Sequence, residues 1–226
     1  MARKQSRHIL AIDIGGGHVK FRVSNRRAVE QFSSGPDMSA SEMVKQVLKR
    51  IGEWRFHCVT VGFPGMVVDG RIVCEPMNLG HGWVGFDFSK AFGRPARIMN
   101  DAAMQALGSY VGGRMLFLGF GTGLGAVLIA DAEIFPMELA HLPFSKRGLI
   151  QKYVGDEARR RLGRARWAAN AKTIIKQLSD ALDVQSVVVG GGNAPRLGRL
   201  PRHVRQGDNK LAFVGGFRAW RDDRFG

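Results

Sequence analysis

Apolar and polar residues alternate in two separate stretches of the chain, and glycines interrupt each stretch. Residues 8–24 (HILAIDIGGGHVKFRVS) contain an apolar run, three glycines and an alternating run, which predicts two strands joined by a turn. Residues 114–130 (RMLFLGFGTGLGAVLIA) repeat this order. A shift of 106 positions lays Asp13 on Gly119 and the first glycine turn on the second. We therefore predict an internal duplication, which suits two similar domains of about one hundred residues each.

The rest of the pattern alternates between helical and extended stretches. We predict helices over residues 40–54, 168–182 and 211–220, where apolar residues recur at helical spacing. We predict strands over residues 58–65, 95–101 and 185–193, the second of them opening a helix, and a short hairpin at Asp69-Gly70. Hairpins followed by alternating helices and strands predict two α/β domains facing a cleft, over residues 1–105 and 106–226.

The composition is that of a soluble globular protein. With 226 residues and 45% hydrophobic content, the chain can bury a large core. It contains neither an apolar run of about 20 residues nor a secretion signal, so we expect no membrane partner. Cys58 and Cys74 have neither metal-ligand spacing nor the density of a disulfide scaffold. We therefore expect a cytoplasmic protein in which both cysteines are small buried hydrophobic residues.

The charge is strongly positive. The chain carries 34 Lys+Arg against 19 Asp+Glu, a net charge of +15. Residues 143–226 hold 18 of these basic residues and 7 of the acidic ones. The densest segment, 158–167 (ARRRLGRARW), is at helical spacing, and it is either a solvated helix face or a site for a polyanion.

Three glycine clusters, DIGGG, GFGTGLG and VVVGGGN, each follow an apolar strand. Glycine allows positive φ and lets backbone N–H groups approach an anion, although glycines also simply close turns. The position after apolar strands favours the ligand interpretation, because ligand crevices of open α/β sheets lie there. None of the clusters is a Walker A loop or a dinucleotide fingerprint that leads into a helix.

The clusters resemble motifs of the sugar kinase, Hsp70 and actin superfamily. AIDIGGGHVK resembles its first phosphate motif, LFLGFGTGLGAVL its second and VVVGGGN its adenosine motif. VGFPGMVVDGRIV, NLGHGW, NDAA and MELAH resemble, in order, segments of ROK-type glucokinases, especially the polyphosphate glucokinase branch. This resemblance implies an α/β fold of two ribonuclease H-like (actin-like ATPase) domains that face a cleft.

The resemblance also assigns roles on the sugar side. Asp101 matches the catalytic base, which accepts the proton of a sugar hydroxyl, although an Asn-Asp pair at a helix start is also a common cap. Trp83 is interpreted as packing. The remaining positions that the resemblance places against the sugar are Gly65, Asn78, Asn100, Glu138 and His141.

On the donor side, Asp13 matches the position that holds Mg²⁺ through water. Two residues depart from the family pattern: Gly17 replaces a Thr or Ser, and Ala140 replaces the Gly before the histidine. The cysteine-rich zinc segment is missing, so we expect no structural zinc. The positions that the resemblance places on the donor phosphates are Gly15, Gly16, Gly17, Lys20, Gly121, Thr122, Gly123 and Gly191.

Together these features predict a Mg²⁺-dependent sugar kinase that phosphorylates the 6-hydroxyl of glucose or a close hexose. The basic last third favours polyphosphate as donor, and VVVGGGN keeps ATP as a donor. The alternative is a non-catalytic sugar-sensing or nucleic-acid-binding ROK-like protein. Only seven residues precede His8, which leaves no room for a helix-turn-helix, so nucleic acid is not the expected partner. Dimers are usual in these families, which leaves a homodimer open.

Overall fold

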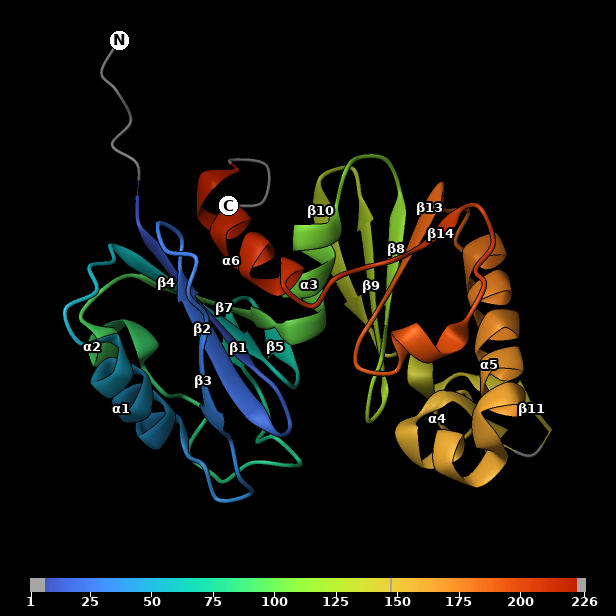
Figure 1. Cartoon of the computed structure of the whole chain (residues 1–226), viewed down its shortest axis with the longest axis horizontal. Helices are drawn as coiled ribbons and strands as arrows, with labels where there is room; N and C mark the ends of the chain where they lie inside the picture. The colour runs from blue at the N-terminus through green and yellow to red at the C-terminus, as the bar shows by residue number, and fades with distance from the viewer. Residues whose placement is uncertain (1–6, 147, 223–226) are drawn as a thin grey trace, which may run out of the picture. The chain divides into compact units, whose positions relative to one another are not determined.

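The computed structural model describes residues 7–146 and 148–222 and divides the chain into two compact units. One unit consists of Met1–Met104 together with Ala212–Gly226, and the other of Gln105–Leu211. The boundaries fall within helix α3 (Asp101–Ser109) and at the start of helix α6 (Leu211–Arg221) (Figure 1). Helix α6 thus lies in the first unit, although it follows the second unit along the chain.

The first unit is built on a five-stranded sheet. The predicted first hairpin is confirmed, because its two strands pair antiparallel with Ile14 opposite Val19. The three strands at the other side of the sheet run parallel to one another, so their carboxyl ends lie at one edge. In spatial order the strands are β3 (Glu30–Ser33), β2 (His18–Val23), β1 (Ile9–Ile14), β4 (Cys58–Phe63) and β7 (Ala96–Asn100).

Helix α1 (Ala40–Ile51) contributes to the larger core of this unit. Ser39 caps its N-terminus, because the Ser39 hydroxyl accepts a hydrogen bond from the Glu42 N–H. Met43, Val47 and Ile51 recur at four-residue spacing and are buried in the same core as alternate residues of β1 and β2. The predicted helix over residues 40–54 is confirmed, and it ends where Gly52 adopts positive φ.

Helix α6 packs on β1 and β4 in a second, smaller core. A Cβ at Gly216 would lie 2.8 Å from the Cβ of Ala11, so only glycine lets the helix approach β1 this closely. The buried Thr60 hydroxyl donates to the Gly216 carbonyl at 2.7 Å and accepts from the Trp220 indole at 3.0 Å. These contacts bind the last helix to the middle of the first sheet.

The second unit repeats the first sheet. Its strands pair in the same order and with the same directions, two antiparallel contacts followed by two parallel ones. Strand β8 begins 106 residues after β1, which is the shift that aligns the two glycine-interrupted stretches of the sequence. The predicted duplication is therefore confirmed at the level of topology. The strands are β10 (Glu133–Met137), β9 (Leu124–Ala130), β8 (Met115–Phe120), β13 (Ser186–Gly190) and β14 (Val204–Gln206).

The core of the second unit lies between this sheet and helix α5 (Asp156–Ala181). The predicted helix over residues 168–182 is the second part of α5, because Gly163, with a φ of 75°, kinks it. Trp167, fully buried just after the kink, donates from its indole to the Val154 carbonyl. The short elements are β5 (Val67–Val68), β6 (Arg71–Ile72), α2 (Phe88–Phe92), η1 (Leu139–His141), β11 (Pro143–Ser145), β12 (Gly148–Leu149), α4 (Gln151–Val154) and η2 (Ala194–Leu197).

Two further expectations can be compared with the structure. The Asp69-Gly70 hairpin is confirmed, with both residues at positive φ between β5 and β6. Cys58 is buried as expected, but Cys74 is exposed, because it follows the edge hairpin β5–β6 rather than lying in the sheet. No helix in the described ranges is long and apolar enough to span a bilayer.

Candidate active site

Two carboxylates of the first unit are placed by neighbouring parallel strands. Asp13 is the fifth residue of β1 and pairs in register with Gly62 of β4, which in turn pairs with Met99 of β7. Asp101 follows β7 directly and begins α3. Because β1, β4 and β7 are parallel, both carboxylates belong to the carboxyl edge of this sheet, where α/β proteins bind ligands.

Desolvation makes both of these carboxyl groups weaker acids than usual. Burial raises the pKa of Asp101 to about 7, and the charge of Asp13 adds to this rise. Burial likewise raises the pKa of Asp13 to about 6, opposed by the ammonium group of Lys20 on the facing strand. A carboxylate whose pKa lies near neutrality is suited to accept a proton at physiological pH.

Asn100 links the carboxyl end of β7 to the turn that carries Gly65. Its amide nitrogen donates to the Gly65 carbonyl at 3.0 Å, and its amide oxygen accepts from the Ala103 N–H at 3.2 Å. Asn100 therefore caps the N-terminus of α3, which is the other common role of an Asn-Asp pair at a helix start. A Cβ on Gly65 would lie 2.6 Å from the Phe63 ring, which explains the glycine.

The loop that carries Asn78 is held by a residue that the sequence did not indicate. The Glu75 carboxylate accepts backbone hydrogen bonds from Gly82, Trp83 and Val84 at 3.2–3.3 Å. Trp83 is fully buried, which confirms its packing role, and its indole donates to the Met38 carbonyl at 3.1 Å. Asn78 itself is exposed. No motif marks Glu75, because only the fold brings it to these three N–H groups.

The first glycine turn is a tight hairpin with open space beside it. The Gly15 N–H donates to the His18 carbonyl at 2.9 Å, while no atom lies within 4 Å of a Cβ placed on Gly16 or Gly17. None of these glycines has positive φ, so this turn does not use the left-handed backbone that glycine allows. Glycine instead leaves the surface of this turn bare, and nothing steric excludes a Ser or Thr at position 17.

The second glycine turn is braced by Gln151 of α4. The Gln151 side chain accepts from the Leu124 N–H at 3.2 Å and donates to the Thr122 carbonyl at 3.4 Å. A Cβ on Gly123 would lie 3.2 Å from the Gln151 amide, so glycine lets this side chain approach. Within the turn, the Gly121 N–H donates to the Gly123 carbonyl at 3.0 Å.

The third glycine cluster packs on the same turn. Gly191 has a φ of 82°, and its Cβ would lie 2.4 Å from the Phe120 carbonyl oxygen, so here both positive φ and the missing side chain are required. The buried Asn193 donates from its backbone to the Phe120 carbonyl at 2.9 Å and from its side chain to the Gly121 carbonyl at 3.3 Å. The third glycine cluster therefore packs against the second turn and helps to fix its shape.

Asp156 completes this bracing network at the start of α5. Its carboxylate accepts from Asn193 at 3.2 Å and is paired with Arg159 at 2.8 Å and Arg160 at 2.6 Å. The hydrogen bonds from Arg159, then from Asn193, lower the pKa of Asp156 to about 2. Its backbone N–H also donates to the Thr122 carbonyl at 3.2 Å. The sequence did not indicate Gln151 and Asp156, which carry no motif of their own, and it indicated Asn193 only as the last residue of the third glycine cluster.

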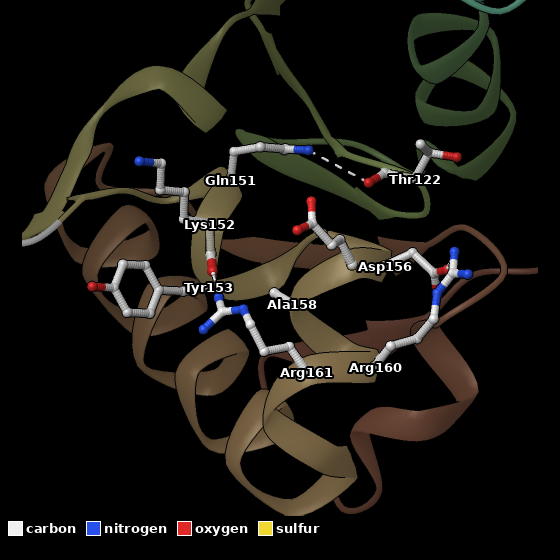
Figure 2. A pocket seen from close by; sticks show the side chains of 10 residues that line it. Thr122, Gln151, Lys152, Tyr153, Asp156, Ala158, Arg160 and Arg161 are labelled. Carbon is white, nitrogen blue, oxygen red and sulfur yellow. Dashed lines mark hydrogen bonds and ion pairs between the residues drawn. The ribbon is translucent and has the colours of Figure 1, made fainter.

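Two pockets lie in the second unit. The larger, about 680 Å³, lies beside the second glycine turn, and Figure 2 shows the side chains of α4 and the start of α5 that line it. We call it the α4–α5 pocket; it is lined by Thr122, Gln151, Lys152, Tyr153, Gly155, Asp156, Glu157, Ala158, Arg160 and Arg161. The smaller, about 350 Å³, is lined by Gly191, Pro195, Gln206, Gly207, Asp208 and Asn209.

Glu138 and His141 also lie in the second unit, at the short helix η1. The His141 N–H donates to the Glu138 carbonyl at 3.2 Å, and both residues are exposed while Ala140 between them is buried. No group of three or more His, Cys, Asp or Glu side chains in the described ranges is arranged to hold a metal ion. The structure thus gathers Asp13, Lys20, Gly65, Asn100 and Asp101 on one unit, and the second and third glycine clusters on the other.

The chain is similar to known polyphosphate-dependent and ATP-dependent kinases. It is 23% identical to polyphosphate glucokinase from Mycobacterium tuberculosis (strain CDC 1551 / Oshkosh) over 209 residues, which cover 82% of this chain and 78% of that protein. No protein-family model matches the chain.

Solved structures share its fold. An inorganic polyphosphate/ATP-glucomannokinase from Arthrobacter sp. strain KM matches with a TM-score of 0.77 and 22% identity, over 94% of this chain and 97% of that one. A ROK family glucokinase from Streptomyces griseus, solved in complex with glucose and AMPPNP, matches with a TM-score of 0.75 and 16% identity, over 95% of this chain and 99% of that one. The expected α/β fold of the actin-like ATPase type is therefore confirmed.

Proposed function

We infer that this chain, a homologue of polyphosphate glucokinases with the fold of the ROK sugar kinases, is a sugar kinase that phosphorylates the 6-hydroxyl of glucose or a close hexose. The observation that carries the proposal is the pair of carboxylates, Asp13 and Asp101, at the carboxyl edge of one parallel sheet. Their raised pKa values are typical of groups that take part in proton transfer or bind a cation.

Asp101 is the proposed general base. The oxygen of the sugar 6-hydroxyl attacks the terminal phosphorus of the donor, its proton passes to the Asp101 carboxylate, and the bond from phosphorus to the leaving phosphate oxygen breaks. A pKa of about 7 leaves a substantial fraction of Asp101 ionised at neutral pH while keeping it basic enough to accept the proton.

Asp13 is the proposed contact to Mg²⁺ through water. The residues fit this ion: Asp13 offers a hard carboxylate oxygen, and Mg²⁺ is usually bound by one or two carboxylates together with substrate phosphates. A full protein cage is not required, which agrees with the lack of any larger ligand cluster in the described ranges. When bound, Mg²⁺ offsets the negative charge of the donor phosphates.

The remaining residues bind and orient the substrates. Acceptor and donor side chains suit sugar hydroxyls, and the side-chain contacts that position Asn100 leave it fixed beside the proposed base. Backbone N–H groups of the two glycine turns, together with Lys20, are proposed to contact the donor phosphates. The proposed sugar contacts are Gly65, Asn78, Asn100, Glu138 and His141, and the proposed donor contacts are Gly15, Gly16, Gly17, Lys20, Gly121, Thr122, Gly123 and Gly191.

We propose polyphosphate as a donor, with ATP as a second one. The support is the net charge of +15, the cluster of six basic and two acidic residues within 152–166, and the two donors named for the Arthrobacter kinase. Binding of a long polyanion releases counterions, so polyphosphate affinity should fall steeply as salt rises.

The deciding experiment compares Asp101→Asn with the parent chain in a coupled assay of glucose phosphorylation, with each donor in turn. We expect kcat to fall by about 10²–10⁴-fold with both donors, because the loss of a general base has about that effect. Asp183→Asn is the matched control, since Asp183 lies in a turn at positive φ, which Asn adopts equally well.

Equal rates for Asp101→Asn and the parent chain would remove Asp101 as the base. A chain that binds glucose but transfers phosphate from neither donor would instead fit the sugar-sensing alternative. Activity with ATP alone would retain the sugar kinase and exclude the polyphosphate donor.

A further inference from the structure

We propose that the α4–α5 pocket binds phosphates of a linear polyphosphate donor beyond the one that is transferred, an inference that rests on the proposed kinase function. The pocket begins at Thr122 on the second glycine turn and extends along α4 and the first turns of α5 (Figure 2). Its volume of about 680 Å³ is within the usual range for ligand pockets. A chain that leaves the second turn in this direction would enter it.

The charges that line the pocket favour an anion. The lining contains three cations, Lys152, Arg160 and Arg161, and two carboxylates, Asp156 and Glu157, which leaves one positive charge in excess. The charge of Asp156 is already neutralised by Arg159, whose guanidinium group lies 2.8 Å from the Asp156 carboxylate. Arg159 itself lies beside the pocket. With Arg159 included, the excess is two positive charges. The arginines also offer several N–H donors each, which match phosphate oxygens.

Two of these cations are held in place, and the third is free to engage a ligand. Arg160 pairs with Asp156 at 2.6 Å, and Arg161 donates to the Lys152 carbonyl at 2.8 Å. The ammonium group of Lys152 makes no hydrogen bond or ion pair in the described part of the chain and is exposed. Lys152 is therefore the cation whose loss should disturb the protein least, and its ammonium group is available to a bound phosphate.

The pocket suits an ionic chain better than a nucleoside. Its one aromatic side chain, Tyr153, is already in use: the ring packs edge-on against Phe144 with centroids 4.9 Å apart, and the hydroxyl bonds Ser145 at 2.7 Å. Apart from Ala158, the other lining residues offer no apolar side chain as a wall for a base. The smaller pocket beside Gly191 is lined by no Lys or Arg, so it offers a polyanion no such contact.

The proposal depends on the local cluster of basic residues at the pocket, because the net charge is nearly the same in the two units. Gln105–Leu211 contains 16 basic and 8 acidic residues, and the rest of the chain contains 18 and 11, so their net charges are +8 and +7. The first turns of α5 concentrate arginines at one place beside a glycine turn. The segment 158–167 thus has pocket residues at its start, and the two arginines after the kink at Gly163, Arg164 and Arg166, are exposed.

The test uses the full chain and measures binding and kinetics separately. We expect Lys152→Gln to raise the KM for long-chain polyphosphate by about 3–10-fold and to change the KM for ATP by less than about twofold, since only the longer donor reaches the pocket. Direct binding of polyphosphate, measured by titration calorimetry, should weaken equally. Its dependence on log salt should become shallower by about 0.7 for the one cation lost. Lys152→Glu should strengthen each effect.

The control is Lys172→Gln with Lys176→Gln, which removes two charges from α5 about three to four turns beyond Arg161, although Lys176 also pairs with Asp180. We expect it to leave the difference between donors unchanged. The proposal is overturned if the control and Lys152→Gln have the same effect, if Lys152→Gln affects ATP and polyphosphate alike, or if the parent chain binds no polyphosphate.

The outcomes separate this proposal from the kinase function. If the chain binds polyphosphate through Lys152 but phosphorylates no hexose, the pocket stands and the proposed function fails. If the chain phosphorylates glucose with ATP and Lys152 has no influence on polyphosphate, the kinase stands and the pocket assignment fails.

Discussion

The two glycine turns have the same position in two sheets of the same topology, yet they differ in what surrounds them. The first turn follows Asp13 and lies bare, with open space beside Gly16 and Gly17. The second follows Gly119 at the equivalent position and is braced by Gln151 and Asn193. One half therefore carries a carboxylate where the other has a glycine, and the other half has side chains that fix the shape of its turn.

The two units also differ in the acidity of one aspartate in each. Desolvation of Asp101 in the first unit, together with the charge of Asp13, raises its pKa to about 7. Asp156 of the second unit is paired with Arg159 and bonded by Asn193, which lowers its pKa to about 2. The first arrangement costs stability when the group is ionised, and the second contributes stability. A cost in stability of this kind is typical of functional sites, whereas paired charges are typical of sites that stabilise the fold.

The strongest test of the comparison gives both turns the same residue at equivalent positions. We expect Asp13→Ala to lower kcat by about 10²–10³-fold, because the contact to the cation is lost, and Gly119→Ala to lower it by no more than about threefold. A Cβ on Gly119 would meet the Phe117 ring at 3.3 Å, which a small shift can absorb. Steady-state kinetics with glucose and each donor provide the measurement, with circular dichroism to verify folding. Equal losses for the two variants would show that the carboxylate does not distinguish the turns.

A second test concerns the third glycine cluster behind the second turn. Gly191→Ala should lower the free energy of unfolding by about 2–3 kcal/mol, because an L-residue is strained at this φ and its Cβ would overlap the Phe120 carbonyl. Gly192→Ala is the control, since its Cβ would meet no atom within 4 Å and its φ is not positive. Urea denaturation compares the two. Similar stability of both variants would mean that the second turn does not depend on this packing.

The two aspartates should respond oppositely to pH. Because the folded protein holds the Asp101 proton up to about pH 7 and the unfolded chain loses it near pH 4, Asp101 reduces stability as pH rises through this window. Asp101→Asn should therefore raise the free energy of unfolding at pH 8 by about 1–3 kcal/mol and have little effect at pH 4.

Asp156→Asn should have the opposite sign. The low pKa of Asp156 contributes stability above about pH 4 that is lost as pH falls toward 2, so the variant should be less stable at pH 6 by about 1 kcal/mol. Chemical denaturation at several pH values measures both variants. A stabilising Asp156→Asn or a destabilising Asp101→Asn at pH 8 would contradict the assigned environments.

The strand and helix pattern was largely predictable from the sequence. Period-two alternation with glycine turns predicted both hairpins, and apolar residues at helical spacing predicted α1, because these signals are local. Site residues such as Asn100 and Asp101 were identified by motif at a strand end, but the contacts of Glu75, Gln151 and Asn193 could not be found in this way. Each contacts a backbone that lies 7 to 72 residues away, and no local spacing encodes such a partner.

By itself the sequence determined the repeated sheet, the series of glycine clusters and the identity of the acidic residues near them, because periodicity and motif order are properties of the chain. The tertiary structure decided how acidic those residues are, which glycine needs its positive φ and which basic residues line a pocket. Desolvation, close packing and the pairing of distant charges depend on neighbours that only the folded chain brings together.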